Sequence, residues 1–240
     1  MKNADISGPL RLSSAGLTDV GRKRTNNEDA FIAEPELGLY AVADGMGGHA
    51  GGAVASKLAA DAFVDAVEQG GGLADGLKDA NAAVGKGTVG KPQLAGMGAT
   101  LVAAHLRGDE VRWISVGDSP FFLIEAGRIE RLNADHSMAP QIDAMVARGL
   151  ITEEEAEHHP GRHTLREAVM GDPLTLIDNG SRRLGPDARL LVCSDGIQSL
   201  KMEQILGQIG RPVDGIIEAV LAAAKEYQDN VTVVKLERAR

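Results

Sequence analysis

Four aspartates close apolar or glycine-rich runs of this chain, and their placement limits the folds that it can adopt. They are Asp44 in LYAVADGMGG, Asp118 in VRWISVGDS, Asp195 in RLLVCSDG and Asp229 in QDNVTVV. Three of these runs are typical of buried strands, so each carboxylate lies where a strand leaves the core. Buried carboxylates are unfavourable unless neutralised, and several that converge repel one another. The pattern therefore predicts a sheet protein that holds a cluster of divalent cations and catalyses a hydrolysis.

Taken one at a time, these aspartates have an ordinary explanation, because Asp beside Gly or Ser is common in turns. Asp229 could likewise cap a strand. The glycines that follow Asp44 lack the Gly-Lys-Ser/Thr of a phosphate-binding loop and the spacing of a dinucleotide fingerprint. Four coincidences in one chain weaken the turn explanation. Ligands that are all oxygen favour Mg²⁺ or Mn²⁺, and the lack of a paired His/Cys pattern argues against zinc.

Composition excludes several classes of protein. The hydrophobic fraction of 43% supports a sizeable core, which must be aliphatic because aromatic residues make up 3%. A net charge of −9 without a basic block predicts no nucleic-acid binding. The single Cys193 excludes an internal disulfide and fits a reducing compartment. No apolar span approaches the about 18–20 residues of a membrane helix, and no secretory signal is evident, so we expect a cytoplasmic protein without membrane contact.

The spacing of apolar residues predicts clustered strands and helices. The expected strands cover residues 10–18, 30–33, 39–43, 99–106, 110–116, 121–125, 128–131, 174–182, 189–194 and 230–236. The expected helices cover 53–67 and 73–84, a short one opened by a Thr152 capping box, and one that begins at Pro212. Short turns between strands require antiparallel pairing. We therefore expect one α+β domain over residues 1–240, with helices outside antiparallel sheets.

Two further segments contain chemically capable side chains. Glu28 and Asp29 adjoin the apolar Ala30-Phe31-Ile32, and neighbouring strand residues point to opposite faces, so only one of the two is expected to reach a metal. Arg24 is a planar, two-pronged donor suited to phosphate. Asp135-His136-Ser137 is not a catalytic triad, because consecutive residues of an extended segment diverge. We expect a solvated surface for His158, His159 and His163, and a core position for Trp113.

Six segments in this order, RTNNED, ADGMGGH, GATLVAA, VGDS, LLVCSDG and DNVTVV, resemble the metal-dependent type 2C serine/threonine protein phosphatases, specifically their bacterial branch. The resemblance extends from about Leu12 to Leu236. It implies a four-layer α-β-β-α sandwich with two mostly antiparallel sheets, outer helices and a metal cluster at one end. It also implies a flap over about residues 137–170 beside the active site.

The resemblance assigns a metal role to six positions, which are Glu28, Asp44, Gly45, Asp118, Asp195 and Asp229. Asp44 is implied to bridge two Mn²⁺ or Mg²⁺ ions, and Asp195 with Asp229 to complete the shell of the first ion. Glu28 and the Gly45 carbonyl are implied to hold the second ion, mostly through water. Asp118, together with Asp195, matches the pair that holds a third, weaker ion.

The implied activity is hydrolysis of phosphoserine and phosphothreonine in proteins. A water or hydroxide that bridges the two ions attacks phosphorus directly, and Arg24 binds the substrate phosphate. The implied partners are phosphorylated proteins, including a bacterial Ser/Thr kinase or its targets, and the expected state is a monomer.

Two departures from the family pattern bear on the site. Met46 occupies the position of a histidine in the eukaryotic branch, which leaves His49 as the nearby candidate for a catalytic role. Pro120 follows Gly-Asp-Ser where many relatives have arginine. Alternative functions are a catalytically silent adaptor that binds phosphoproteins, or a phosphatase of a small phosphorylated molecule or an anti-sigma regulator.

Overall fold

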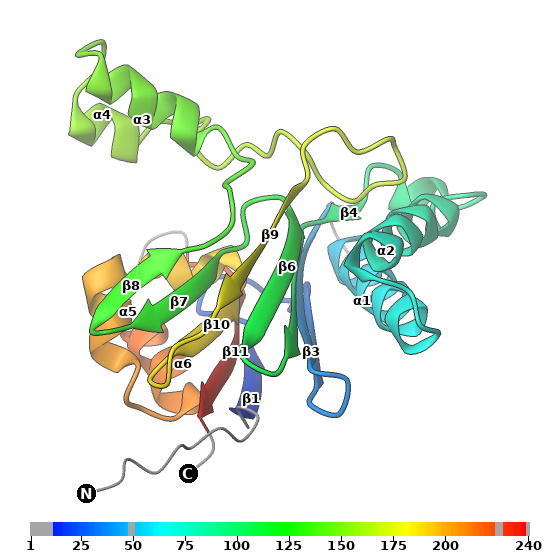
Figure 1. Cartoon of the computed structure of the whole chain (residues 1–240). Coiled ribbons are helices and arrows are strands. Elements are labelled where there is room, and N and C mark those ends of the chain that lie inside the picture. The colour runs from blue at the N-terminus through cyan, green and yellow to red at the C-terminus, as the bar shows by residue number, and fades with distance from the viewer. Residues whose placement is uncertain (1–11, 48–50, 224–227, 239–240) are drawn as a thin grey trace, which may run out of the picture.

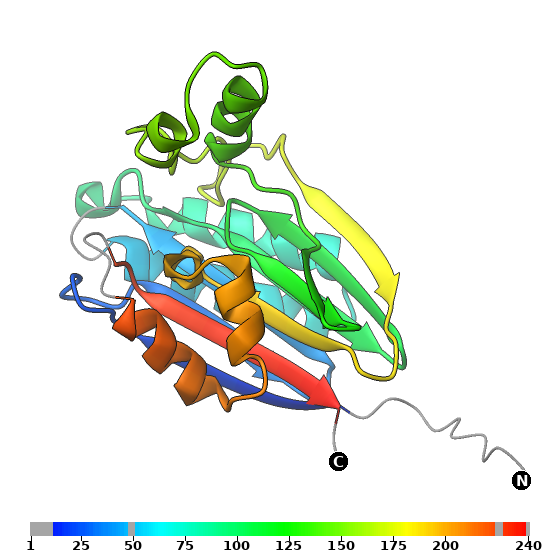
Figure 2. The same cartoon turned by 90° about the vertical axis from the view of Figure 1, so that its left-hand side faces the viewer.

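The computed structural model describes residues 12–47, 51–223 and 228–238, and it is a sandwich of two β-sheets between two layers of helices. Figures 1 and 2 show the two sheets face to face, with α1 and α2 outside one sheet and α5 and α6 outside the other. The expected four-layer α-β-β-α architecture is confirmed.

Every strand pairing among the described residues is antiparallel. The five-stranded sheet has the order β1 (Leu12–Asp19), β11 (Val231–Arg238), β10 (Arg189–Cys193), β7 (Phe121–Glu125) and β8 (Arg128–Arg131). The six-stranded sheet has the order β2 (Asp29–Glu34), β3 (Leu39–Met46), β5 (Leu101–Arg107), β6 (Glu110–Val116) and β9 (Asp178–Arg183), with β4 (Gly98–Ala99) paired to β3.

Three apolar layers explain why several strands are apolar along their whole length. In β10, Leu190 and Val192 face the layer between the sheets, whereas Leu191 and Cys193 face the outer helices. Both faces of the strand are therefore buried, which replaces the usual alternation with a continuous apolar run. The outer helices are α1 (Gly51–Glu68) and α2 (Leu73–Gly87) on one side, and α5 (Met202–Gln208) and α6 (Val213–Ala222) on the other.

Helices α1 and α2 approach each other closely at Gly76, where an added Cβ would lie 2.9 Å from Cδ2 of the fully buried Phe63. We expect Gly76→Ala to lower the free energy of unfolding by about 1–3 kcal/mol through overpacking. Gly207→Ala in α5 is the matched control, since a Cβ there meets nothing within 4 Å. The control should raise stability by about 0.5–1 kcal/mol, the helix-propensity gain over Gly. Urea unfolding measures both, and equal stability of the two variants would contradict the close contact.

The structure differs from the predicted secondary structure in the start of one strand and in one helix that was not predicted. The strand expected over residues 174–182 begins only at Asp178, because the Glu167 carboxylate accepts hydrogen bonds from the backbone and hydroxyl of Thr175 and from the Leu176 N–H, at 2.7–3.0 Å. No local pattern indicated α5, whose seven residues bury only Ile205 and are too few to show a helical period. The Thr152 capping box is confirmed, with the Glu155 N–H 3.1 Å from Oγ1 of Thr152.

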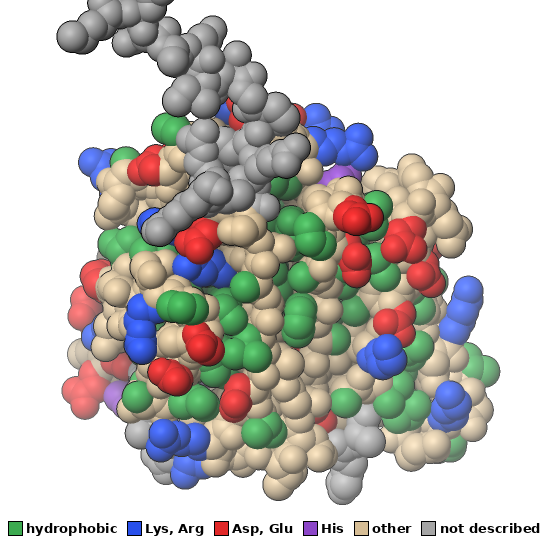
Figure 3. Space-filling model, turned by 90° about the horizontal axis from the view of Figure 1, so that it is seen from below, with side chains coloured by type: hydrophobic (Ala, Val, Ile, Leu, Met, Phe, Trp, Pro, Cys, Tyr) green, Lys and Arg blue, Asp and Glu red, His purple; other side chains and the backbone are tan. Residues whose placement is uncertain are grey.

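Helices α3 (Ala139–Ala147) and α4 (Glu153–Glu157) project away from the sandwich (Figures 1 and 2). Two backbone hydrogen bonds close the base of this projection, from Met138 to Thr164 and from Arg166 to His136. On the face seen from below, hydrophobic side chains gather near the centre, with acidic and basic side chains around them (Figure 3). None of the helices in the described ranges is long and apolar enough to cross a bilayer.

Candidate active site

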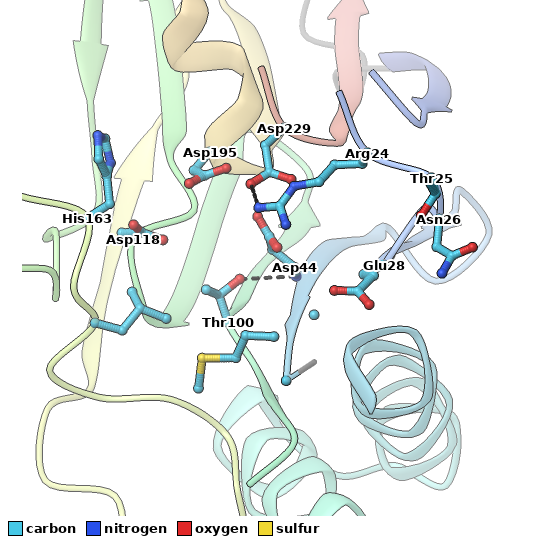
Figure 4. Close-up of a pocket in the computed structure, with 14 residues that line it drawn as sticks. Arg24, Thr25, Asn26, Glu28, Asp44, Thr100, Asp118, His163, Asp195 and Asp229 are labelled. Atoms are coloured by element: carbon cyan, nitrogen blue, oxygen red, sulfur yellow. Dashed lines mark hydrogen bonds and ion pairs between the residues drawn. The ribbon is translucent and has the colours of Figure 1, made fainter. Parts of the chain in front are cut away.

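The six predicted metal positions and Arg24 line one cleft of about 710 Å³ (Figure 4). The residues that line it are Arg24, Thr25, Asn26, Glu28, Asp44, Gly45, Met46, Gly47, Thr100, Asp118, His163, Leu165, Asp195 and Asp229. Asp44 lies near the end of β3, Asp118 follows β6, and Asp195 follows β10. The acids thus come from both sheets at one end of the sandwich. Their roles as metal ligands remain predictions.

Asp44 is fixed by its neighbours on two strands. It pairs with Asp29 across β2 and β3. Its backbone N–H donates to the Thr100 hydroxyl at 3.1 Å, and its carbonyl accepts from the Thr100 N–H at 2.8 Å. The Thr100 hydroxyl lies 2.7 Å from that of Ser119, in the turn that contains Asp118. Two of the acids are therefore connected through a buried pair of hydroxyls.

Gly45 has no room for a side chain. An added Cβ would lie 2.1 Å from the Gly52 carbonyl oxygen and 2.5 Å from that of Glu28. This close approach of three backbone segments requires glycine. It also brings the start of α1 against Glu28, since a Cβ on Gly52 would lie 2.5 Å from Oε2 of Glu28.

Asp29 connects the two sheets, a role that the sequence did not indicate. Glu28 lines the cleft, whereas Oδ2 of Asp29 accepts hydrogen bonds from the hydroxyls of Ser194 (2.7 Å) and Thr232 (2.6 Å). Asp29 therefore joins β2 of one sheet to β11 and to the residue that follows β10 in the other. The available signal was two polar residues, Ser194 and Thr232, inside otherwise apolar runs.

Several carboxylates at this end of the sandwich have raised pKa values, so each is harder to ionise than an ordinary aspartate. Burial, followed by repulsion from neighbouring aspartates, raises the pKa of Asp44 and Asp195 well above the ordinary value. Burial raises the pKa of Asp29 and of Asp118 to about 6. Asp29, Asp44 and Asp195 are half-buried, and Asp44 and Asp195 line the cleft. The buried part of each carboxylate sets the direction of its pKa shift, because burial disfavours the charged form.

Arg24 already neutralises one acid of the cleft. Its Nη2 lies 2.5 Å from Oδ2 of Asp229, and this hydrogen bond raises the Arg24 pKa. Its side chain is 56% exposed, and the other guanidinium N–H groups donate to none of the described residues. The loop that carries Arg24 is fastened by Asn230, which donates to the carbonyls of Val20 and Asn26 and accepts from the Glu28 N–H.

The donors in the cleft fit a hard divalent cation. Within the described ranges, no three His, Cys, Asp or Glu side chains are already close enough to hold an ion. One oxygen of Asp229 is occupied by the guanidinium of Arg24. Oδ1 of Asp29 and Oδ1 of Asp195 are buried and accept no hydrogen bond from the described residues. Unsatisfied carboxylate oxygens with raised pKa values, and no sulfur or imidazole in the predicted set, suit Mg²⁺ or Mn²⁺.

The histidines and Trp113 were the subject of further expectations from the sequence. His49 lies outside the described residues. His163 is exposed and lines the cleft, a position that its sequence context did not indicate. Asp135, His136 and Ser137 form no triad, because Nδ1 of His136 accepts from the Gly117 N–H. Trp113 is only partly buried, at the margin of the layer between the sheets, and its indole N–H donates to Asp178.

Comparison with known proteins gives a consistent result. Residues 20–231 match the family model described as Protein phosphatase 2C. The chain is 36% identical over 238 residues to the serine/threonine protein phosphatase PstP of Mycobacterium tuberculosis, and the match covers 94% of this chain but 45% of that protein. It is 30% identical over 240 residues to the serine/threonine phosphatase stp of Listeria monocytogenes, which covers 92% of this chain and 94% of that protein.

Solved structures show the same likeness. The Mycobacterium tuberculosis phosphatase PstP/Ppp superposes with a TM-score of 0.83 at 32% identity, over 95% of this chain and 99% of that one. The catalytic domain of PstP in complex with two manganese ions superposes with a TM-score of 0.82 at 32% identity, over 96% of this chain and 100% of that one.

Proposed function

Because this chain belongs to the protein phosphatase 2C family, we propose that it hydrolyses phosphoserine and phosphothreonine in proteins with Mn²⁺ or Mg²⁺. The observation that carries the proposal is the meeting of Arg24 and the six predicted ligand positions in one cleft. A silent adaptor is not favoured, since every predicted metal acid is retained and the relatives are named phosphatases. Its substrates are phosphorylated proteins, and it opposes a bacterial Ser/Thr kinase.

We assign the ligand roles from the family resemblance, which the placement of these residues around one cleft supports. Asp44 is central, with Asp195 and Asp229 from the five-stranded side, and Glu28 with the Gly45 carbonyl from the six-stranded side. Asp118 and Asp195 are assigned to a third, weaker ion. When bound, the ions supply activation of a water molecule and neutralisation of phosphoryl charge.

The chain itself binds and orients the substrate. The exposed guanidinium of Arg24 presents free N–H donors into the cleft, where they bind phosphoryl oxygens in a planar, two-pronged geometry. The same group stabilises the charge that grows on these oxygens as the bond to the serine or threonine oxygen breaks. Thr100 and Ser119 hold the backbone of Asp44 in place beneath the substrate. The projecting residues 137–170 act as a flap that influences substrate choice.

Phosphate release from a phosphothreonine peptide tests this function. We expect wild-type activity to require added Mn²⁺ and to fall by about 10³-fold or more in Asp195→Asn. Asp61→Asn is the matched control, an exposed aspartate of α1 that pairs with Lys57, and it should retain full activity. Folded wild type that releases no phosphate from peptides or from p-nitrophenyl phosphate would refute the proposal. Turnover of the small ester alone would exclude a protein substrate.

A further inference from the structure

The turn that carries Asp118 is held from behind by the segment that leaves β8. Asp118 lies between β6 and β7 and is 5% exposed. Gly117 has φ +99°, and a Cβ there would lie 2.6 Å from Cγ2 of Thr100, so the turn is tightly confined on that side. On the other side, His136 hydrogen-bonds the backbone of Gly117 twice, through its own N–H and through Nδ1.

Arg131, the last residue of β8, makes the most direct connection. Its Nη2 donates to the Asp118 carbonyl oxygen at 2.7 Å, and its Nη1 donates to Oδ2 of Asp135 at 3.0 Å. Its Nε lies 3.3 Å from Oδ1 of Asn133. The side chain is 21% exposed, so the guanidinium is held in a defined position by three partners.

The residue after Gly-Asp-Ser is the uncharged Pro120. The guanidinium that contacts this turn therefore comes from the β7–β8 hairpin, where Arg131 pairs with Phe122 and donates to the Asp118 carbonyl.

We propose that Arg131 is a positioning residue that fixes the Asp118 turn for a weakly bound divalent cation. This inference rests on the proposed function, which assigns Asp118 to a third ion. Arg131 is not among the residues that line the cleft. It fixes the backbone that carries Asp118 from behind, as partners behind metal ligands commonly do.

Direct Mn²⁺ binding to the metal-free protein, measured by calorimetry, tests the proposal independently of catalysis. We expect Arg131→Met to keep the tight sites within about twofold and to weaken the weakest site by about tenfold or more. Asp118→Asn should lose that site. Arg131→Lys keeps the charge but not the planar fork, and should fall between Met and wild type. Arg128→Met, at the exposed start of the same strand, is the matched control and should bind as wild type does.

Steady-state kinetics provide the second measurement. For Arg131→Met, the Mn²⁺ concentration for half-maximal phosphate release should rise by about tenfold, with KM for the phosphopeptide within about twofold. Unchanged weak-site binding in Arg131→Met would overturn the proposal, and so would equal weakening of the tight sites, which would indicate a general structural role. Inactive wild type with the expected binding pattern would refute the proposed function while leaving the role of Arg131 supported.

Discussion

Replacing Asp44 with asparagine is expected to abolish phosphate release, by about 10³-fold or more, and to stabilise the metal-free protein. The amide would keep the shape of the side chain but remove a charge that burial and four neighbouring aspartates disfavour. Without metal that repulsion destabilises the folded state, so its removal should raise the melting temperature, at about 2–4 °C per kcal/mol in a domain of this size. Calorimetric melts in EDTA and the phosphopeptide assay in Mn²⁺ measure the two effects.

The pH dependence of stability provides a check on this explanation. The folded-state pKa values of Asp29 and Asp118, about 6, lie above the ordinary value of 3.8. The native state thus binds more protons between these values, and stability decreases as pH rises through this window. We expect metal-free wild type to melt at a higher temperature at pH 5 than at pH 7.5, and Mn²⁺ to remove that difference at pH 7.5. Histidines with lowered pKa act in the opposite direction, but they are common to wild type and Asp44→Asn, so the difference between the two isolates the carboxylates.

Two outcomes would contradict the cluster explanation. One is an Asp44→Asn variant that melts below wild type in EDTA, which would mean that the carboxylate stabilises the fold without metal. The other is a metal-free melting temperature that rises with pH between 5 and 7.5 in wild type but not in the variant. Asp61→Asn again serves as the control, since its carboxylate is exposed on α1.

Replacing Arg24 with glutamine is expected to act on substrate and metal in opposite directions. Loss of the guanidinium should lower kcat/KM for the phosphopeptide by about 10²–10³-fold, the range for removal of one preorganised donor. The same change frees Oδ2 of Asp229, so Mn²⁺ binding should strengthen or stay the same. Because exposed ion pairs contribute little, we expect the gain in Mn²⁺ affinity to stay below about fivefold.

Arg22→Gln separates this effect from a general loss of positive charge. Arg22 is exposed in the same loop, and its backbone N–H, which the substitution keeps, donates to Gln228. The control variant should keep both kcat/KM and Mn²⁺ affinity. A matching loss of activity in both variants would indicate long-range attraction of the substrate, and weaker Mn²⁺ binding in Arg24→Gln would show that Arg24 supports the metal site.

The ends of the strands were predictable because each apolar run stops at a polar turn. The strands 110–116, 121–125 and 128–131 agree with β6, β7 and β8, because hairpin turns mark the start of β6 and the junction of β7 with β8. The cluster of acids could also be predicted, because an aspartate that directly follows a buried strand lies where the strands of the sheet end. What the sequence could not show is which polar residues meet across the two sheets, as Asp29 meets Ser194 and Thr232. Such contacts depend on how one sheet is placed over the other, and no local pattern records that placement.

The residues that hydrogen-bond the turn of Asp118 could not be predicted from the sequence for a related reason. Arg131 ends β8, whereas Asp118 lies thirteen residues earlier in the turn between β6 and β7. A lone arginine at the end of a strand is usually a solvated side chain. Its role depends on the direction in which β8 ends relative to the β6–β7 connection. Helix α5 was missed for a simpler reason, because one buried residue in seven leaves no periodicity to read.

The candidate ligands belong to opposite sheets, so the ions would lie over the seam where the two sheets meet. Asp44 lies on β3 and Glu28 directly precedes β2 of the six-stranded sheet, whereas Asp195 and Asp229 adjoin β10 and β11 of the five-stranded one. The distances between the candidate ligands would then depend on the spacing between the two sheets. A repacking in the middle layer, for instance at Val102 against Leu190, would lengthen or shorten those distances, without any change in the residues of the cleft. The geometry of the cleft would therefore depend on side chains that lie entirely within the layer between the sheets.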